Sequence, residues 1–247
     1  MNAPPKYRRP LNNYQVAILN TLYKFRFTTT ALLAENQNAK NLRVISSRLK
    51  ILVDQDYIGM NYDSSYRIKG QPATYYLKTD GIRYLRAQNY TNESALRSIY
   101  HDKRAAPSQI AHRLHVFQVY VQLKNQYPRR FKFYSKTELM SKDYVPKTKP
   151  DALLVDTETN QHHFMDYLED TASFWTLRKT IRRYITYAEL SIWQKYKPEI
   201  SHPKILFVCE SPGLAKKVVA LANRELDNSF IDLSIQVVSS ENFYVTL

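Results

Sequence analysis

Two aspartates in the second half of the chain have the residue type and the spacing of a metal-dependent hydrolase. Asp151 follows Pro150 at the start of a strand-like run, and Asp166 lies in the next such run, MDYLED. Adjacent strands can bring two carboxylates together, and such a pair can hold a divalent cation that activates water. Lys179, on the helix expected to follow, is an amine available to the same site. These three residues are therefore the catalytic candidates, and Asp151 and Asp166 are the metal-binding candidates.

A cluster of basic residues follows the aspartates in the segment LRKTIRRYITY, residues 177–187. Residues four positions apart are neighbours on a helix, so the spacing places these cations side by side. One interpretation is that Arg178, Arg182 and Arg183 bind phosphate. The other is that they pair with the acidic residues just upstream. Those acids are Asp166, Glu169 and Asp170.

The elements that must position these side chains predict an α/β domain over residues 108–247. We expect a helix over 108–125, strands within 131–139, 151–158 and 162–169, a helix over 173–195, a strand over 204–209, a helix from Pro212 and a strand over 231–238. The layout resembles the core of PD-(D/E)xK nucleases. The lysine position of that motif is Leu168, so the resemblance is to a degenerate core. It implies no cofactor unless the nuclease is active, in which case it implies Mg²⁺.

The first half of the chain contains a pattern typical of DNA recognition in residues 41–77. Apolar residues at helical spacing predict a helix from residue 41, and two strand-like runs, 57–62 and 74–77, predict a ribbon. With two helical patterns before it, the second of them short, this is the order of a winged helix-turn-helix domain. The expected DNA-binding residues are polar or basic side chains on the helix and at the tip of the ribbon. They are Arg43, Ser46, Ser47, Arg48 and Lys50 on the helix and Arg67 and Lys69 at the tip.

The distribution of charge supports a polyanionic partner for this half. The formal charge of the chain is +14. Residues 1–105 hold 17 Lys and Arg against 7 Asp and Glu, which is +10, and residues 106–247 hold 19 against 15, which is +4. Excess positive charge that coincides with a recognition motif favours double-stranded DNA as the partner.

Other sequence features restrict the remaining classes of function. The single cysteine, Cys209, excludes an internal disulfide and a cysteine-rich zinc site. The adjacent His162 and His163 lack the alternation of a paired-histidine relaxase. Without a signal peptide or an apolar run of membrane length, we expect a cytoplasmic protein with no membrane partner.

These observations predict an α+β protein of two domains. We expect a basic N-terminal arm at 1–10, a winged-helix DNA-binding domain at 11–88, a linker at 89–107 and the nuclease-like α/β domain at 108–247.

The chain also resembles the replication-relaxation family of plasmids and integrative elements. The resemblance is carried by QPATYYLKTDGIRYL (71–85), HRLHVFQVYVQL (112–123), PDALLV (150–155), FMDYLEDTAS (164–173) and RKTIRRYITY (178–187), in that order. It implies a winged helix joined to a nuclease-like domain and a role in replication or mobilisation, often beside a relaxase. Asp166 stands where the family usually has a glutamate.

We therefore predict a sequence-specific double-stranded DNA-binding accessory protein of a plasmid or integrative element, without catalytic activity. Its further partners would be a relaxase or another mobilisation or replication protein, or a second copy in a homodimer. Two alternatives remain. One is a metal-dependent DNA endonuclease of the PD-(D/E)xK type, and the other is a winged-helix transcriptional repressor.

Overall fold

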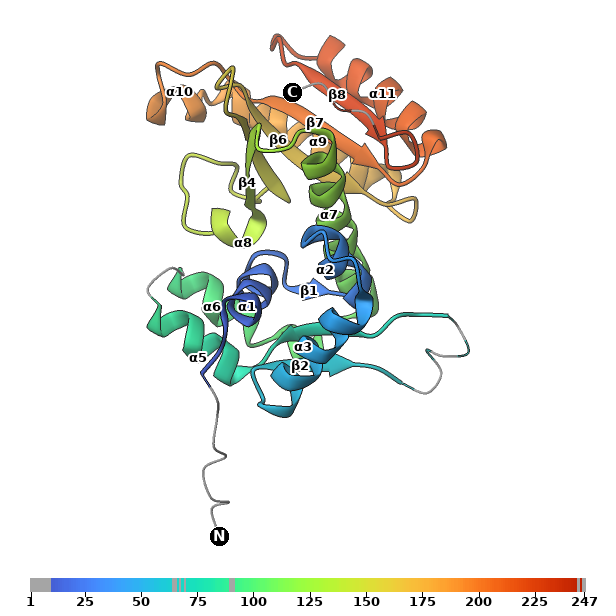
Figure 1. Cartoon of the computed structure of the whole chain (residues 1–247). Coiled ribbons are helices and arrows are strands. Elements are labelled where there is room, and N and C mark those ends of the chain that lie inside the picture. The colour runs from blue at the N-terminus through green and yellow to red at the C-terminus, as the bar shows by residue number, and fades with distance from the viewer. Residues whose placement is uncertain are drawn as a thin grey trace. The chain divides into compact units, whose positions relative to one another are not determined.

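The computed structural model describes residues 10–63, 66, 68, 70–88, 92–243 and 245. The predicted N-terminal arm, apart from Pro10, and the predicted contacts Arg67 and Lys69 lie outside these residues. The chain divides between Val121 and Gln122 into two compact units, each with its own sheet (Figure 1). The mixture of helices and sheets confirms the predicted α+β class at this level.

The first unit contains the three helices and the two-stranded ribbon that the sequence predicts, in that order, with the short strand β1 between the first two helices. Its elements are α1 (Asn13–Phe25), β1 (Phe27–Thr28), α2 (Thr30–Asn36), α3 (Leu42–Asp54), β2 (Ile58–Asn61), β3 (Thr74–Leu77), α5 (Thr79–Ala87), α6 (Glu93–Ile99) and the 3₁₀ turn η1 (Asp102–Arg104). Helix α7 (Pro107–Gln126) carries the boundary between the units.

Polar side chains cap the starts of the first three helices. Asn12 and Gln15 form a capping box at α1, with both bonds 3.0 Å long. The Thr29 hydroxyl accepts from the amide of Leu32, and the Asn41 side chain accepts from the amide of Arg43. Each cap satisfies an amide that has no partner within its helix.

A three-stranded antiparallel sheet in the order β1-β3-β2 closes the first unit. Ile58 of β2 pairs with Leu77 of β3, and Phe27 of β1 pairs with Tyr76. Ile18, Leu49 and Ile58 belong to one buried apolar cluster, so helices and sheet share a core.

Residues 89–107 differ from the predicted linker, because most of the described part is packed against the first unit. Ala95, Leu96 and Ile99 of α6 are buried in its core. Arg26 donates from Nε to Asp102 Oδ2 over 2.7 Å, which ties η1 to the end of α1. The polar composition and weak periodicity of this segment gave no sign of such packing, because α6 has only three apolar residues.

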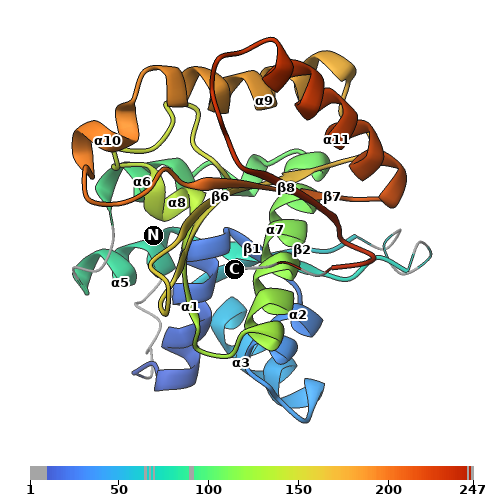
Figure 2. The ribbon, with the colours of Figure 1, turned by 90° about the horizontal axis from the view of Figure 1, so that it is seen from above.

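The second unit is built on a five-stranded mixed sheet in the order β4-β5-β6-β7-β8. β4 (Phe131–Ser135), β5 (Ala152–Asp156) and β6 (His162–Leu168) are antiparallel neighbours, whereas β7 (Lys204–Cys209) and β8 (Ile235–Ser239) continue in parallel with β6. Helices α9 (Phe174–Glu189) and α11 (Pro212–Asp227) cover one face of this sheet (Figure 2). The short helices are α8 (Lys136–Leu139) and α10 (Ile192–Tyr196).

Three predicted boundaries in this unit are wrong for local reasons. The strand expected over 131–139 ends at Ser135, because Ser135 and Glu138 form a capping box that begins α8. The helix expected over 173–195 is interrupted at Ser191, whose φ of 49° is left-handed and separates α9 from α10. The last strand begins at Ile235 rather than at residue 231.

The described helices give no candidate for a membrane span, since none combines sufficient length with sufficient apolar character.

Candidate functional site

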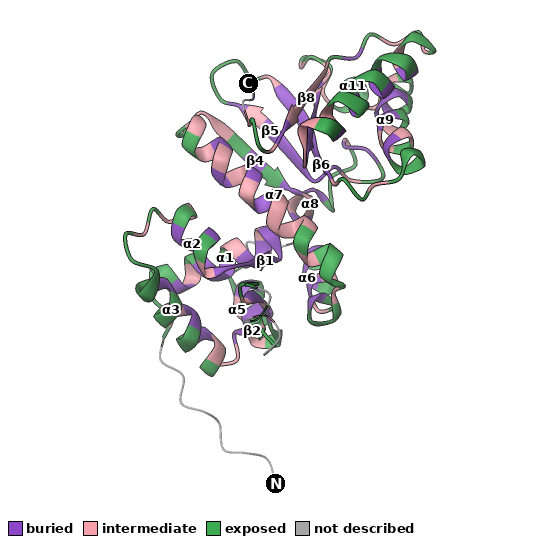
Figure 3. Ribbon diagram, turned by 90° about the vertical axis from the view of Figure 1, so that its right-hand side faces the viewer, coloured by how far each residue is buried: buried purple, intermediate pink, exposed green. Residues whose placement is uncertain are grey.

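Helix α3 presents a polar, basic face to solvent. Ile45, Leu49 and Leu52 are fully buried and fix the helix to the first unit. Arg43, Ser46, Ser47 and Lys50 are exposed on the outer side, where Figure 3 shows most of α3 as exposed. Among the described residues, neither Arg43 nor Lys50 has an ion-pair partner, so both positive charges are available to a ligand.

Arg48 differs from the other predicted contacts because it is already held by the first unit. Its guanidinium lies 4.0 Å from the ring centroid of Tyr14, and its Nη1 lies 3.4 Å from Gln37 Oε1. This stacking holds the side chain against α1 at half exposure. A planar guanidinium in this position can still present its free edge to a phosphate.

Val44 corrects the predicted apolar stripe of α3. Val44 is one of the apolar residues whose helical spacing predicts the helix from residue 41, and that spacing would place it on the buried side. In the structure Val44 is 44% exposed, as is Ile51. The two residues are seven apart and therefore share a face, which lies beside the basic residues. An apolar group at this surface is suited to the methyl group of thymine.

Asp151 and Asp166 lie side by side in the second unit. Ala152 pairs with Met165 across β5 and β6, which sets the aspartates opposite each other. The Asp151 amide donates to Asp166 Oδ1 over 3.1 Å, and the Tyr167 amide donates to Asp151 Oδ2 over 3.2 Å. Both aspartates are almost completely buried. The structure therefore brings together the two carboxylates that the sequence singled out.

Cations and a phenol surround this carboxylate pair. Arg183 Nη2 forms an ion pair with Asp166 Oδ2, and the Tyr184 hydroxyl donates to the same oxygen over 2.7 Å. Lys136 Nζ lies 3.6 Å from Asp151 Oδ1. Burial and then the charge of Asp166 raise the pKa of Tyr184, so its hydroxyl stays a donor. Burial would lower the pKa of Arg183, but Asp166, Tyr184 and Asp151 together outweigh it and raise that pKa, so the guanidinium stays charged.

The predicted amine does not join the pair. Lys179 is exposed on α9 and forms no ion pair with any described residue. Leu168, which stands where the predicted resemblance to nucleases would require a lysine, is buried in the core. The amine that does lie beside the carboxylates is that of Lys136, and its place within the strand expected over 131–139 gave no sign of this role.

The residues around the aspartates do not fit a Mg²⁺ site. Within the part of the chain that the structure describes, no three His, Cys, Asp or Glu side chains are grouped as metal ligands. Asp166 Oδ2 already receives Arg183 and Tyr184, so a cation would have to displace both. The arrangement compensates buried negative charge with fixed protein donors.

The other arginines of α9 pair with an acid that the sequence did not suggest. Arg178 Nε and Arg182 Nε each lie 2.7 Å from the carboxylate of Glu225 on α11. Burial would raise the pKa of Glu225, but the bonds from both arginines outweigh it and lower that pKa. Of the predicted acidic partners, Asp166 pairs with Arg183, while the pairing of Arg178 and Arg182 is with Glu225. This acid lies 47 residues from Arg178 in sequence, beyond the reach of helical spacing.

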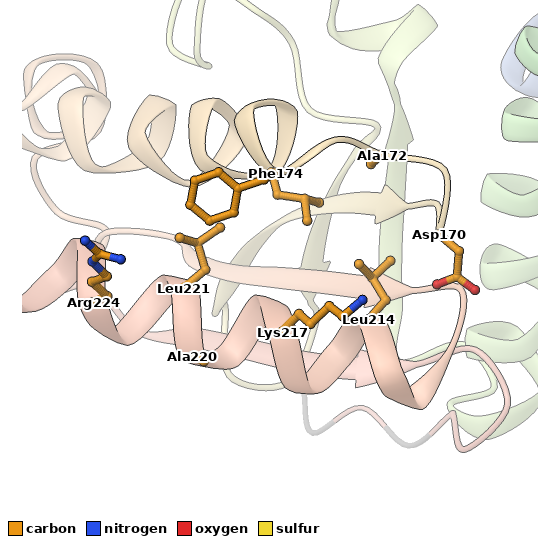
Figure 4. Close-up of a pocket in the computed structure, with 9 residues that line it drawn as sticks. Asp170, Ala172, Phe174, Leu214, Lys217, Ala220, Leu221 and Arg224 are labelled. Atoms are coloured by element: carbon orange, nitrogen blue, oxygen red, sulfur yellow. The ribbon is translucent and has the colours of Figure 1, made fainter.

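A hollow of about 440 Å³ separates the start of α9 from α11. Figure 4 shows Phe174, Leu214 and Leu221 directed into it, with Lys217, Arg224 and Asp170 at its margins. Its lining is mainly apolar, which makes it a surface for packing rather than for acid–base chemistry.

The fold and these side chains define an α+β protein of two units, with a basic solvent-facing helix in one and a cation-neutralised aspartate pair in the other. A family model described as replication-relaxation matches residues 19–201, and the chain belongs to the replication-relaxation family. This confirms the resemblance carried by the five quoted segments and supports a role in replication or mobilisation. No curated protein and no solved structure gives a significant match.

Proposed function

We propose that the first unit is a winged-helix domain that binds a specific double-stranded DNA sequence. The order α1, β1, α2, α3, β2, β3 and the sheet order β1-β3-β2 support this assignment. In this arrangement α3 is the recognition helix, and β2 and β3 are the strands of the wing.

The exposed face of α3 supports this proposal most directly. Arg43 and Lys50 carry free positive charges, and Ser46 and Ser47 lie between them. An arginine can make two bonds to guanine in the major groove, while lysine and serine bind phosphate or base edges. Val44 and Ile51 add apolar surface for thymine methyl groups. One face of α3 thus carries side chains that can attract the DNA backbone and side chains that can distinguish between bases.

We further propose that the chain is a non-catalytic accessory factor of a plasmid or integrative element. Family membership supports the setting in replication or mobilisation. The second unit would be a degenerate PD-(D/E)xK-like domain. Leu168 stands in place of the motif's lysine, and Arg183 forms an ion pair with the carboxylate of Asp166. Its role would be contact with a relaxase or other mobilisation protein, with a second copy, or with flanking DNA.

Selection of bound sites from random duplex DNA tests the binding proposal. An enriched motif is expected, and a two-fold repeat within it would support a homodimer. Arg43→Ala should weaken binding to that motif by about 1–3 kcal/mol and relax the preference at one base pair. Lys50→Ala should weaken binding to all duplexes by a similar factor and reduce the salt dependence of the binding affinity.

Arg83→Ala is the matched control, because Arg83 is an exposed arginine of the same unit that pairs with Asp80 on α5. It should leave the enriched site and its affinity unchanged. Failure to enrich any sequence, or equal losses in Arg43→Ala and Arg83→Ala, would overturn the assignment of α3 as the recognition helix.

The adjacency of Asp151 and Asp166 is the specific observation that favours the second candidate, a metal-dependent DNA endonuclease. In that case Arg183 would have to leave Asp166 before a cation could bind. Cleavage assays separate the two candidates.

A further inference from the structure

A groove along the outer flank of α9 has no part in the proposed recognition of duplex DNA. It lies in the second unit, has a volume of about 600 Å³ and is bounded on its other side by residues 146–148. On the helix its lining recurs every three or four residues, from Thr176 to Leu190, which is one continuous face. Its size falls within the range of roughly 300–1,000 Å³ that holds small organic ligands and exceeds the needs of a single inorganic anion.

Four cations line this groove, and its lining contains no carboxylate. They are Lys147, Lys179, Arg182 and Arg183. Asp166 and Glu225 hold the two arginines, whereas Lys147 and Lys179 form no ion pair among the described residues. The groove therefore has about two positive charges without an acidic partner. Its two guanidinium groups are already held in place by Glu225 and Asp166 before a ligand binds.

Hydroxyl groups and apolar surface complete the lining. The hydroxyls of Thr148 and Thr186 have no hydrogen-bond partner among the described residues, so they are available to ligand oxygens. Pro146, Leu190 and Ile192 supply apolar surface in the same groove. Cations and hydroxyls suit a phosphate group, and an apolar surface beside them suits a planar base.

The wall opposite α9 is held in place by bonds within the second unit. The Tyr187 hydroxyl donates to the carbonyl of Tyr144, and Lys149 Nζ donates to the carbonyl of Lys142 over 2.6 Å. The Tyr144 ring meets Trp193 edge-on, with centroids 5.9 Å apart. The loop that carries Lys147 is thereby fixed before any ligand arrives, which reduces the entropy lost on binding.

We propose that this groove binds a nucleoside 5′-phosphate unit, with Lys147 and Lys179 on the phosphate and the apolar surface on the base. The unit can come from a free nucleotide or from the end of a DNA strand. This site is separate from α3, and its ligand is a single nucleotide unit rather than a duplex sequence.

Calorimetric titration of the full chain tests the proposal. The four deoxynucleoside 5′-monophosphates are titrated separately, beside thymidine, inorganic phosphate and a 5′-phosphorylated hexathymidylate. At least one phosphorylated nucleotide or the hexamer should bind saturably, and the Lys147→Ala/Lys179→Ala variant should lose at least about tenfold in affinity. The control Lys195→Ala/Lys216→Ala removes two other exposed lysines of the same unit and should bind as the unmodified chain does.

The outcomes separate the sources of the ligand. Tight binding of a monophosphate supports a free nucleotide, and tight binding of the hexamer alone supports a DNA end. Inorganic phosphate bound as tightly as the nucleotides would overturn the assignment of a nucleoside unit. Absence of saturable binding, or equal loss in the two lysine variants, would overturn the site. Arg43→Ala should leave these titrations unchanged, so the result stands apart from duplex recognition.

Discussion

Arg183 of α9 and Asp166 of β6 form an ion pair that connects the helix layer to the middle strand of the second sheet. Their side chains are 18% and 8% exposed, and Tyr184 donates to the same carboxylate oxygen over 2.7 Å. In this setting the carboxylate is hydrogen-bonded and shielded from water. We infer that this ion pair stabilises the packing of α9 against the sheet. Asp166 would then serve the fold and not the binding of a metal ion.

Arg183→Ala should destabilise the protein strongly. Removal of one partner leaves a buried charge uncompensated, which costs about 3–5 kcal/mol. The double variant Arg183→Met/Asp166→Asn removes both charges and should recover much of this loss, as a double-mutant cycle would reveal. The measurement is the free energy of unfolding from denaturant titration.

Lys78→Ala is the control for this experiment. Lys78 and Asp56 form a pair of similar chemistry, but their side chains are 45% and 44% exposed. Its loss should cost at most about 1 kcal/mol. Similar losses for Arg183→Ala and Lys78→Ala would show that burial does not decide the strength of the Arg183 pair.

The protein should not cleave DNA in the presence of Mg²⁺ or Mn²⁺. Arg183 and Tyr184 both bond to the Asp166 carboxylate. The position at which the nuclease motif would have its lysine is the buried Leu168. Plasmid and linear duplexes incubated with the unmodified chain should match those incubated with Asp151→Asn in gel assays. Metal-dependent cleavage that disappears in Asp151→Asn would establish the nuclease alternative.

Contacts between residues that are close in sequence could be predicted better than contacts between distant elements. Asn12, Thr29 and Asn41 cap their helices and are residue types that favour helix starts, and a cap acts over only three residues. The pairing of Asp151 with Asp166 was also predictable, since a short turn joins the two strands. In both cases the information lies within a short stretch of the chain.

Relationships across elements were not accessible in the same way. Periodicity tells which side of α9 is polar, but it does not tell that α11 supplies Glu225 to Arg178 and Arg182. Likewise, Arg26 and Asp102 meet although 76 residues separate them. Such pairs depend on the packing of whole elements. The packing of α6 and η1 against the first unit also depends on contacts with distant elements, so the polar composition of residues 89–107 could not predict it.

Acidification should destabilise the fold through His163. This histidine is fully buried, and burial lowers its pKa from 6.5 to about 4. Between these values the unfolded chain binds a proton that the folded chain does not, so stability falls as the pH falls from 6.5 to 4. At pH 5 the loss from this residue should be about 2 kcal/mol relative to pH 7.5.

His163→Leu isolates this contribution. The substitution removes two ring nitrogens that have no hydrogen-bond partner among the described residues. The difference in unfolding free energy between pH 7.5 and pH 5 should therefore be smaller in the variant, by the amount just given. Burial also lowers the pKa values of His162 and His202, so part of the acid sensitivity should remain. An unchanged difference in His163→Leu would contradict the assignment to His163.

Gly81 should be irreplaceable at the contact between α5 and the start of β2. A Cβ at this position would lie 2.3 Å from the carbonyl oxygen of Tyr57, which is backbone and has little freedom to move. Gly81→Ala should destabilise the protein by about 1–3 kcal/mol because overpacking forces α5 and the start of β2 apart.

Gly213→Ala is the matched change within α11, where the nearest atom to a new Cβ is 3.8 Å away. That variant should be neutral or more stable by up to about 1 kcal/mol, since alanine favours the helix. Thermal unfolding of the two variants decides the matter: a fall in Tm for Gly213→Ala equal to that for Gly81→Ala would mean that contact with Tyr57 is not what requires glycine.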